Sequence, residues 1–158
     1  MADCPAEMLT GERVADQDFP DNEILYRRFS SKHLMPGPKV NLAAIDLPDM
    51  SVNRSKGGGT LEHVLVGNEA YGVFGFFVGD IPSESFHNGR RHSFKPVHVP
   101  HRKNYFHSEI QCFDFEGVHI IASEAIPQQI LFRWRYQLRE KTKVLRTPAT
   151  TADSAAYM

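Results

Sequence analysis

Residues Tyr71 to Gly79, with the sequence YGVFGFFVG, form the most apolar stretch of the chain. Apolar side chains would lie on both sides of a strand drawn through them, which predicts an inner strand with both faces covered. The two glycines inside the stretch disfavour a helix and indicate a bulge or a close crossing by a neighbouring segment. We therefore expect a sheet that is built around this strand.

Shorter apolar runs lie on both sides of this stretch. Ile24 to Phe29 is rich in strand-forming side chains, and Val40 to Ile45 is a second short apolar run. Phe94 to Val99 is predicted to be an edge strand, because Pro96 and Pro100 each lack the N–H that a sheet ladder needs.

Tyr105 to Phe113 alternates in polarity. The even-numbered side chains from Phe106 to Cys112 would share one face, and the odd-numbered ones from His107 to Phe113 the other. A turn at Gly117 then predicts a hairpin with Val118 to Ile121.

One convincing helix follows. Ser123 is a credible N-cap, and Pro127 is tolerated because it lies near the start. Apolar residues recur at helical spacing and predict one face packed on a sheet: Ile126, Ile130, Leu131, Trp134 and Leu138. Lys141 and Lys143 would fall in the last turn.

A chain of 158 residues suits one domain, which at this length buries roughly two-thirds of the surface of the unfolded chain. We predict an α+β fold, a mainly antiparallel sheet with one C-terminal amphipathic helix packed on it. Residues 1–22 carry six acids against one base and predict an acidic N-terminal arm, either solvated or covering a basic face of the same chain. Residues 23–146 would form the single globular domain, and 147–158 a disordered tail.

The two cysteines, Cys4 and Cys112, have no CxxC spacing and make no disulfide framework, which favours a reducing, cytoplasmic location. No apolar run approaches the roughly 18–20 residues that span a bilayer. The N-terminus has acids where a signal peptide has bases and an apolar run. We therefore expect no membrane association, and the sequence does not indicate an oligomeric state.

The segment from Phe86 to His107 carries five Lys or Arg, five of the eight histidines and no carboxylate. Cations neutralise phosphates and aromatic rings stack on bases, so this pattern is typical of proteins that bind RNA or single-stranded DNA. The candidate nucleic-acid-binding residues are Arg90, Arg91, Arg102, Lys103, Arg133 and Arg135. A partner protein is the alternative ligand, particularly through the acidic arm.

The histidines also suggest catalysis. On a strand, His107 and Glu109 point the same way, and with His101 they are the candidate catalytic residues. One imidazole as base, another as acid and a neighbouring cation on the phosphate would cleave a phosphodiester. His98 joins these residues in a set that Zn, Mn or Fe accepts, but its spacing matches no known metal site.

A looser pattern involves Arg27 or Arg28 on the first strand, Ser51 on the second and Glu109 on a late one. This order resembles the Arg, Ser, Glu triad of ADP-ribosyltransferases. The resemblance implies that the arginine grips a phosphate of NAD and that the glutamate steers the ribose.

Three consecutive glycines, Gly57 to Gly59, precede Thr60, a candidate N-cap of a short helix over Leu61 to Val66. They predict either a surface loop or a phosphate-binding turn. The spacing is neither that of the Walker motif nor that of the dinucleotide fingerprint, so no cofactor is identified.

Leu25-Tyr26-Arg27-Arg28, then Ser51-Val52-Asn53-Arg54, then His107-Ser108-Glu109 resemble short uncharacterised bacterial proteins with an LYRR, SVxR and H-A/S-E order. Asn53 stands where that pattern has Asp. The resemblance implies a bacterial origin and a multigene, defence-related setting, and it supplies no activity.

Two hypotheses follow. The first is a small accessory module that contacts nucleic acid or a partner protein through a basic His/Arg-rich face. The second is a His-dependent enzyme that acts on phosphodiester or nucleotide substrates.

Overall fold

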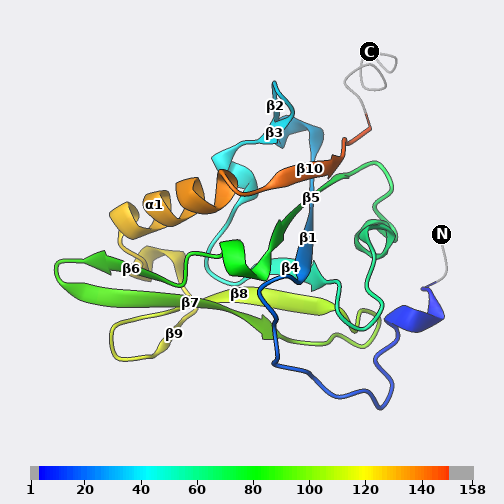
Figure 1. Ribbon diagram of the computed structural model, residues 1–158, viewed down its shortest axis with the longest axis horizontal. Helices are drawn as coiled ribbons and strands as arrows, with labels where there is room; N and C mark the ends of the chain where they lie inside the picture. The colour runs from blue at the N-terminus through cyan, green and yellow to red at the C-terminus, as the bar shows by residue number, and fades with distance from the viewer. Residues whose placement is uncertain (1–3, 150–158) are drawn as a thin grey trace.

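In the computed structural model, residues 4–149 form an eight-stranded antiparallel sheet, a separate two-stranded ribbon and one α-helix (Figure 1). The order of strands in the large sheet is β10-β5-β1-β4-β8-β7-β6, with β9 paired to β8. Its strands are β1 (Ile24–Phe29), β4 (Met50–Arg54), β5 (Gly72–Phe77), β6 (Glu84–His87), β7 (Arg90–His98), β8 (His107–Phe113), β9 (His119–Ile120) and β10 (Lys143–Arg146). The ribbon pairs β2 (Leu34–Met35) with β3 (Lys39–Val40).

The helix α1 (Gln128–Arg139) packs on one face of this sheet and closes the core (Figure 1). Ile130, Trp134 and Leu138 on α1 are fully buried. The ring of Trp134 stacks on Phe94 of β7 at a centroid distance of 5.2 Å, and its indole N–H donates to the Pro82 carbonyl. The predicted fold class, α+β with one C-terminal amphipathic helix on an antiparallel sheet, is confirmed.

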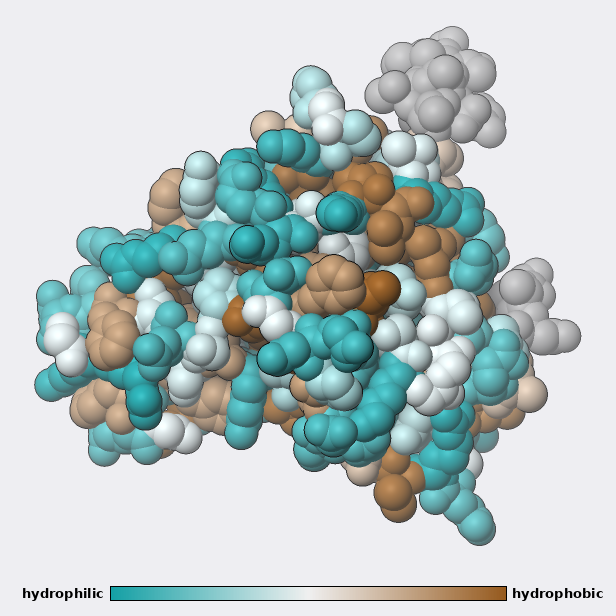
Figure 2. Space-filling view, viewed as in Figure 1, coloured by the Kyte–Doolittle hydropathy of each residue, from teal (hydrophilic) through white to brown (hydrophobic). Residues whose placement is uncertain are grey.

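The apolar strand β5 pairs with β1 on one side and with β10 on the other, so it is an inner strand as predicted. Its glycines allow the close crossing. A Cβ on Gly75 would lie 2.8 Å from a methyl of Leu145, and one on Gly72 would lie 2.7 Å from the Arg146 carbonyl oxygen. Figure 2 shows that this side of the molecule is mainly hydrophilic, with apolar residues gathered over β5 and β10.

The strand β7 differs from the prediction, because it is longer and lies inside the sheet between β6 and β8. Asn88 and Gly89 both have positive φ, 52° and 74°, as a two-residue type I′ hairpin requires. The hairpin adds β6 as the true edge strand. Pro96 is tolerated at an inner position opposite Ile110.

The helix also begins later than predicted. Ser123 opens a separate 3-10 turn, Ser123–Ala125, and Pro127 precedes the first residue of α1. Lys143 does not offset the helix dipole, because it starts β10. The alternation of β8 and its hairpin with β9 are confirmed.

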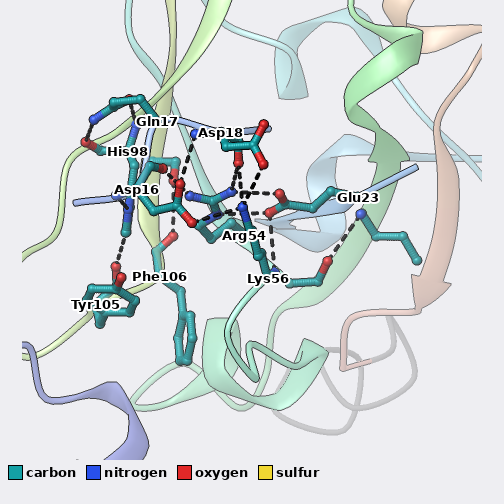
Figure 3. Close-up of polar contacts among 12 residues, drawn as sticks. Asp16, Gln17, Asp18, Glu23, Arg54, Lys56, His98, Tyr105 and Phe106 are labelled. Carbon is teal, nitrogen blue, oxygen red and sulfur yellow. Dashed lines mark hydrogen bonds and ion pairs between the residues drawn. The ribbon is translucent and has the colours of Figure 1, made fainter. Parts of the chain in front are cut away.

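The N-terminal segment, residues 4–22, is hydrogen-bonded to the domain at Asp16 and Asp18 (Figure 3), although most of its residues are exposed to solvent. Arg54, at the end of β4, is 1% exposed and makes a bidentate ion pair with Glu23, with N–O distances of 2.7 and 3.0 Å. The same guanidinium donates to the Asp16 and Asp18 carbonyls. One buried arginine therefore ties the arm to the sheet.

Further 3-10 turns are Ala6–Met8, Ser31–His33, Leu42–Ala44, Leu61–Leu65 and Val78–Asp80. Within residues 4–149, none of the helices is long and apolar enough to cross a membrane. Most of the predicted 147–158 tail falls outside the described residues.

Candidate functional site

The polar residues of interest lie on three neighbouring strands, β1, β4 and β8. Tyr26 pairs with Asn53, Asn53 with His107, and Ser51 with Glu109. The alternate residues of these strands, such as Val52 and Ile110, join α1 in the core. The site therefore lies on the sheet face opposite α1.

A groove of about 660 Å³ opens on this face. Its floor is made by side chains of the three strands: Tyr26, Ser51, Asn53 and His107. Around it lie two cations and two rings from β1 and the loops: Arg28, Lys32, Tyr71 and His101. A groove of this size with convergent polar groups is typical of a small-molecule site.

His107 is the best-positioned base in the groove. Its Nδ1 lies 3.0 Å from the Val99 carbonyl oxygen, and a carbonyl only accepts, so Nδ1 carries the proton and Nε2 keeps a free lone pair. Nε2 lies 3.4 Å from the Ser51 hydroxyl. Burial lowers the pKa of His107, against the opposing effect of the Val99 bond. The imidazole is therefore neutral and basic at pH 7.

His101 stacks on His107 with a centroid distance of 3.7 Å. Its position in the turn after β7 leaves it exposed at the edge of the groove. The structure thus brings the two predicted catalytic histidines together. Glu109 lies two residues after His107 on β8. It is half-buried and accepts a hydrogen bond from Gln111 Nε2 at 3.2 Å.

Two successive hydrogen bonds through the side-chain amide of Asn104 orient Asn53. The Phe106 N–H donates to Asn104 Oδ1, and Asn104 Nδ2 donates to Asn53 Oδ1 at 2.7 Å. Asn53 Nδ2 is then buried without a partner among the described residues, as is the Ser30 hydroxyl. Both residues line the groove, but these two atoms are themselves buried, so a ligand in the groove would reach them only after a local rearrangement of the side chains.

The two arginines of β1 have different roles. Arg27 donates to the Ala44 carbonyl at 2.9 Å and to the Ser51 carbonyl at 2.7 Å, which fixes the backbone beside the groove. Arg28 is exposed, with its guanidinium carbon 5.8 Å from the centre of the Tyr71 ring. Arg28 is therefore the arginine that can bind an anion in the groove.

His98, predicted among the metal-binding candidates, is not part of this groove. Its Nδ1 accepts from the Asp16 N–H of the arm at 2.9 Å, and burial lowers its pKa. Among residues 4–149 no three His, Cys, Asp or Glu side chains are grouped to hold a metal ion.

The six predicted nucleic-acid-binding cations are not brought together. Arg90 and Arg91 begin the nine-residue strand β7, whereas Arg102 and Lys103 follow its end, which separates the pairs by roughly 25–30 Å. Arg133 donates to the Ser85 hydroxyl and the Phe86 carbonyl, and Arg135 pairs with Asp46 at 2.9 Å.

The glycine loop is held by the chain itself. A Cβ on Gly59 would lie 2.0 Å from the Arg54 carbonyl oxygen, so the loop is pressed against β4. Thr60 caps the five-residue 3-10 helix Leu61–Leu65 together with His63, where the sequence predicted a helix over Leu61 to Val66.

Sequence reasoning did not find Tyr26, Asn104 or Lys32 as groove residues. No local pattern marks them, because they meet only through strand pairing and loops. Comparisons of the chain with protein-family models, curated proteins and solved structures gave no match.

Proposed function

We propose that this chain is an enzyme that binds a nucleotide in the groove and uses His107 as a general base. The observation that carries the proposal is the fixed tautomer of His107, whose free Nε2 faces a groove that also holds Arg28 and Lys32. A base must lie in reach of the proton it removes, and the cations suit a phosphate.

The other groove residues fit the same ligand. Tyr26 and Tyr71 offer rings for a base or ribose to contact. The exposed imidazole of His101, which stacks on the imidazole of His107, is the candidate general acid.

The proposal is tested by incubating the full chain with NAD, ADP-ribose, ATP, a cyclic dinucleotide and a short RNA, and by following binding by native mass spectrometry and turnover by chromatography. We expect Arg28→Gln to weaken binding of the preferred nucleotide by about 10- to 100-fold, because a hydrogen bond to a charged group contributes roughly 1.5–3 kcal/mol.

Arg90→Gln is the matched control. Arg90 is exposed at the end of β7 that lies away from the groove, and its guanidinium lies over the Phe115 ring. Binding by none of the five ligands, or equal losses in the two variants, would contradict a nucleotide site in the groove.

A second candidate function is NAD-dependent ADP-ribosyl transfer. Glu109 is paired with Ser51 on the neighbouring strand β4, and Arg28 lies on β1, which pairs with β4 at Tyr26 and Asn53. The three residues of the Arg, Ser, Glu order therefore lie on three neighbouring strands, which supports this second candidate.

For this second function, nicotinamide release from NAD is the measurement. We expect Glu109→Gln to reduce it by at least about 100-fold, because an amide cannot stabilise developing positive charge as a carboxylate does. Glu116→Gln, at an exposed turn, serves as the control. Unchanged release in Glu109→Gln would exclude this chemistry.

A further inference from the structure

Ser51 is an exposed residue of β4 that lines the groove. His107 Nε2 is the ring nitrogen that faces it, at 3.4 Å from Oγ. A hydroxyl next to a neutral imidazole nitrogen is the arrangement by which a base activates a nucleophile. This distance is longer than a good hydrogen bond, as is common in catalytic pairs before substrate binds.

A third group orients the pair. The Val99 carbonyl accepts from His107 Nδ1 and thereby aims the basic nitrogen at Ser51, which is the positioning task that a carboxylate performs in a Ser-His-Asp triad. Arg27 holds the Ser51 carbonyl at 2.7 Å and so limits movement of the nucleophile's backbone.

The surroundings of Ser51 can hold a phosphoryl group. Arg28 is exposed and lines the groove, where it can bind a phosphate oxygen. Lys32 lines the same groove and supplies a second cation. Cations placed in this way stabilise the charge that builds up on phosphoryl oxygens.

We propose that Ser51 is a nucleophile that His107 activates toward the phosphorus of a phosphate ester. The Ser51 oxygen forms a bond to phosphorus, the bond from phosphorus to the leaving alkoxide breaks, and the serine proton passes through His107 to that alkoxide. His107 then takes a proton from water as the water oxygen attacks the phosphorus of the phosphoserine, the bond from phosphorus to the Ser51 oxygen breaks, and His107 returns the proton to that oxygen, which releases phosphate and restores the serine. This inference rests on the proposed function and adds a covalent step to it.

The test uses an alkyl fluorophosphonate, whose phosphorus is attacked with loss of fluoride. The full chain is incubated with the reagent, and the labelled residue is located by peptide mass spectrometry. We expect one adduct on Ser51, its loss in Ser51→Ala, and a rate of labelling lower by roughly 10²-fold in His107→Gln.

Ser83→Ala is the matched control, because Ser83 is also exposed but belongs to no hydroxyl–imidazole pair in the described structure. In this variant the reagent should label Ser51 at the same rate as in the unmodified chain. Labelling of several serines alike, or an unchanged rate in His107→Gln, would overturn the inference. Nucleotide binding without any Ser51 adduct would refute the covalent step and leave the proposed function standing, whereas an adduct without nucleotide binding would refute the nucleotide site alone.

Discussion

Replacing His107 with glutamine is expected to lower kcat/KM for the preferred nucleotide by roughly 10²- to 10⁴-fold, the usual contribution of a general base. The glutamine amide can still donate to the Val99 carbonyl, which accepts from His107 Nδ1 in the unmodified chain. It cannot take up a proton. The Kd of the nucleotide should change little, because Arg28 and the other residues of the groove are intact. Steady-state kinetics and native mass spectrometry on the same samples separate the two effects.

His87→Gln is the matched control, since His87 ends β6 at the far hairpin and should leave kcat/KM unchanged. Full activity in His107→Gln would contradict the assignment of the base.

The pH dependence gives an independent check on the same residue. A base works in its neutral form, so activity should fall as the pH drops through the pKa of His107. Burial places that pKa below the ordinary value of 6.5. His101 and His98 lower it further, whereas Glu109 raises it. Replacing His101 with alanine should therefore move the acidic limb of the profile to higher pH.

Local patterns in the sequence were enough for the core of the fold. The alternation over β8 and the apolar run of β5 each report which side chains are buried, and both were correct. The Asn88-Gly89 pair is also a local signal, and it specifies the β6–β7 hairpin. The arginines and histidines around this pair obscure the signal, because they indicate a ligand-binding segment rather than a hairpin.

The site was harder to predict because it depends on the order of strands. Nothing local says that β1, β4 and β8 are neighbours, yet this pairing is what joins Arg28, Ser51 and His107. The three short motifs LYRR, SVNR and HSE fall on these three strands. Their order in the sequence indicated the strands that carry the site. The side-chain contacts were needed to show that Arg27 binds backbone carbonyls whereas Arg28 is exposed.

The largest effect on stability is expected at Arg54. Replacing it with methionine should lower the free energy of unfolding by about 3–5 kcal/mol, because Glu23, 6% exposed, would keep a buried charge without its partner. The Asp16 and Asp18 carbonyls of the arm would also lose their donor. Urea denaturation at neutral pH with linear extrapolation measures the change.

Lys56→Ala is the control within the same network, since Lys56 pairs with Asp16 and Asp18 at the surface, where solvent screens ion pairs. It should change the unfolding midpoint little. A loss of stability in Arg54→Met no greater than that in Lys56→Ala would show that Arg54 does not anchor the arm.

A double replacement then separates the charge from the anchoring. Glu23→Leu alone should also be strongly destabilising, since Arg54 would be left as the buried charge without a carboxylate. Combining it with Arg54→Met removes both charges, so the double variant should be more stable than either single one. It should still fall short of the unmodified chain, because the two arm carbonyls remain without donors. A double variant as unstable as the sum of the two single ones would mean that Glu23 and Arg54 act independently, and an unpaired buried charge would then not explain the loss of stability in Arg54→Met.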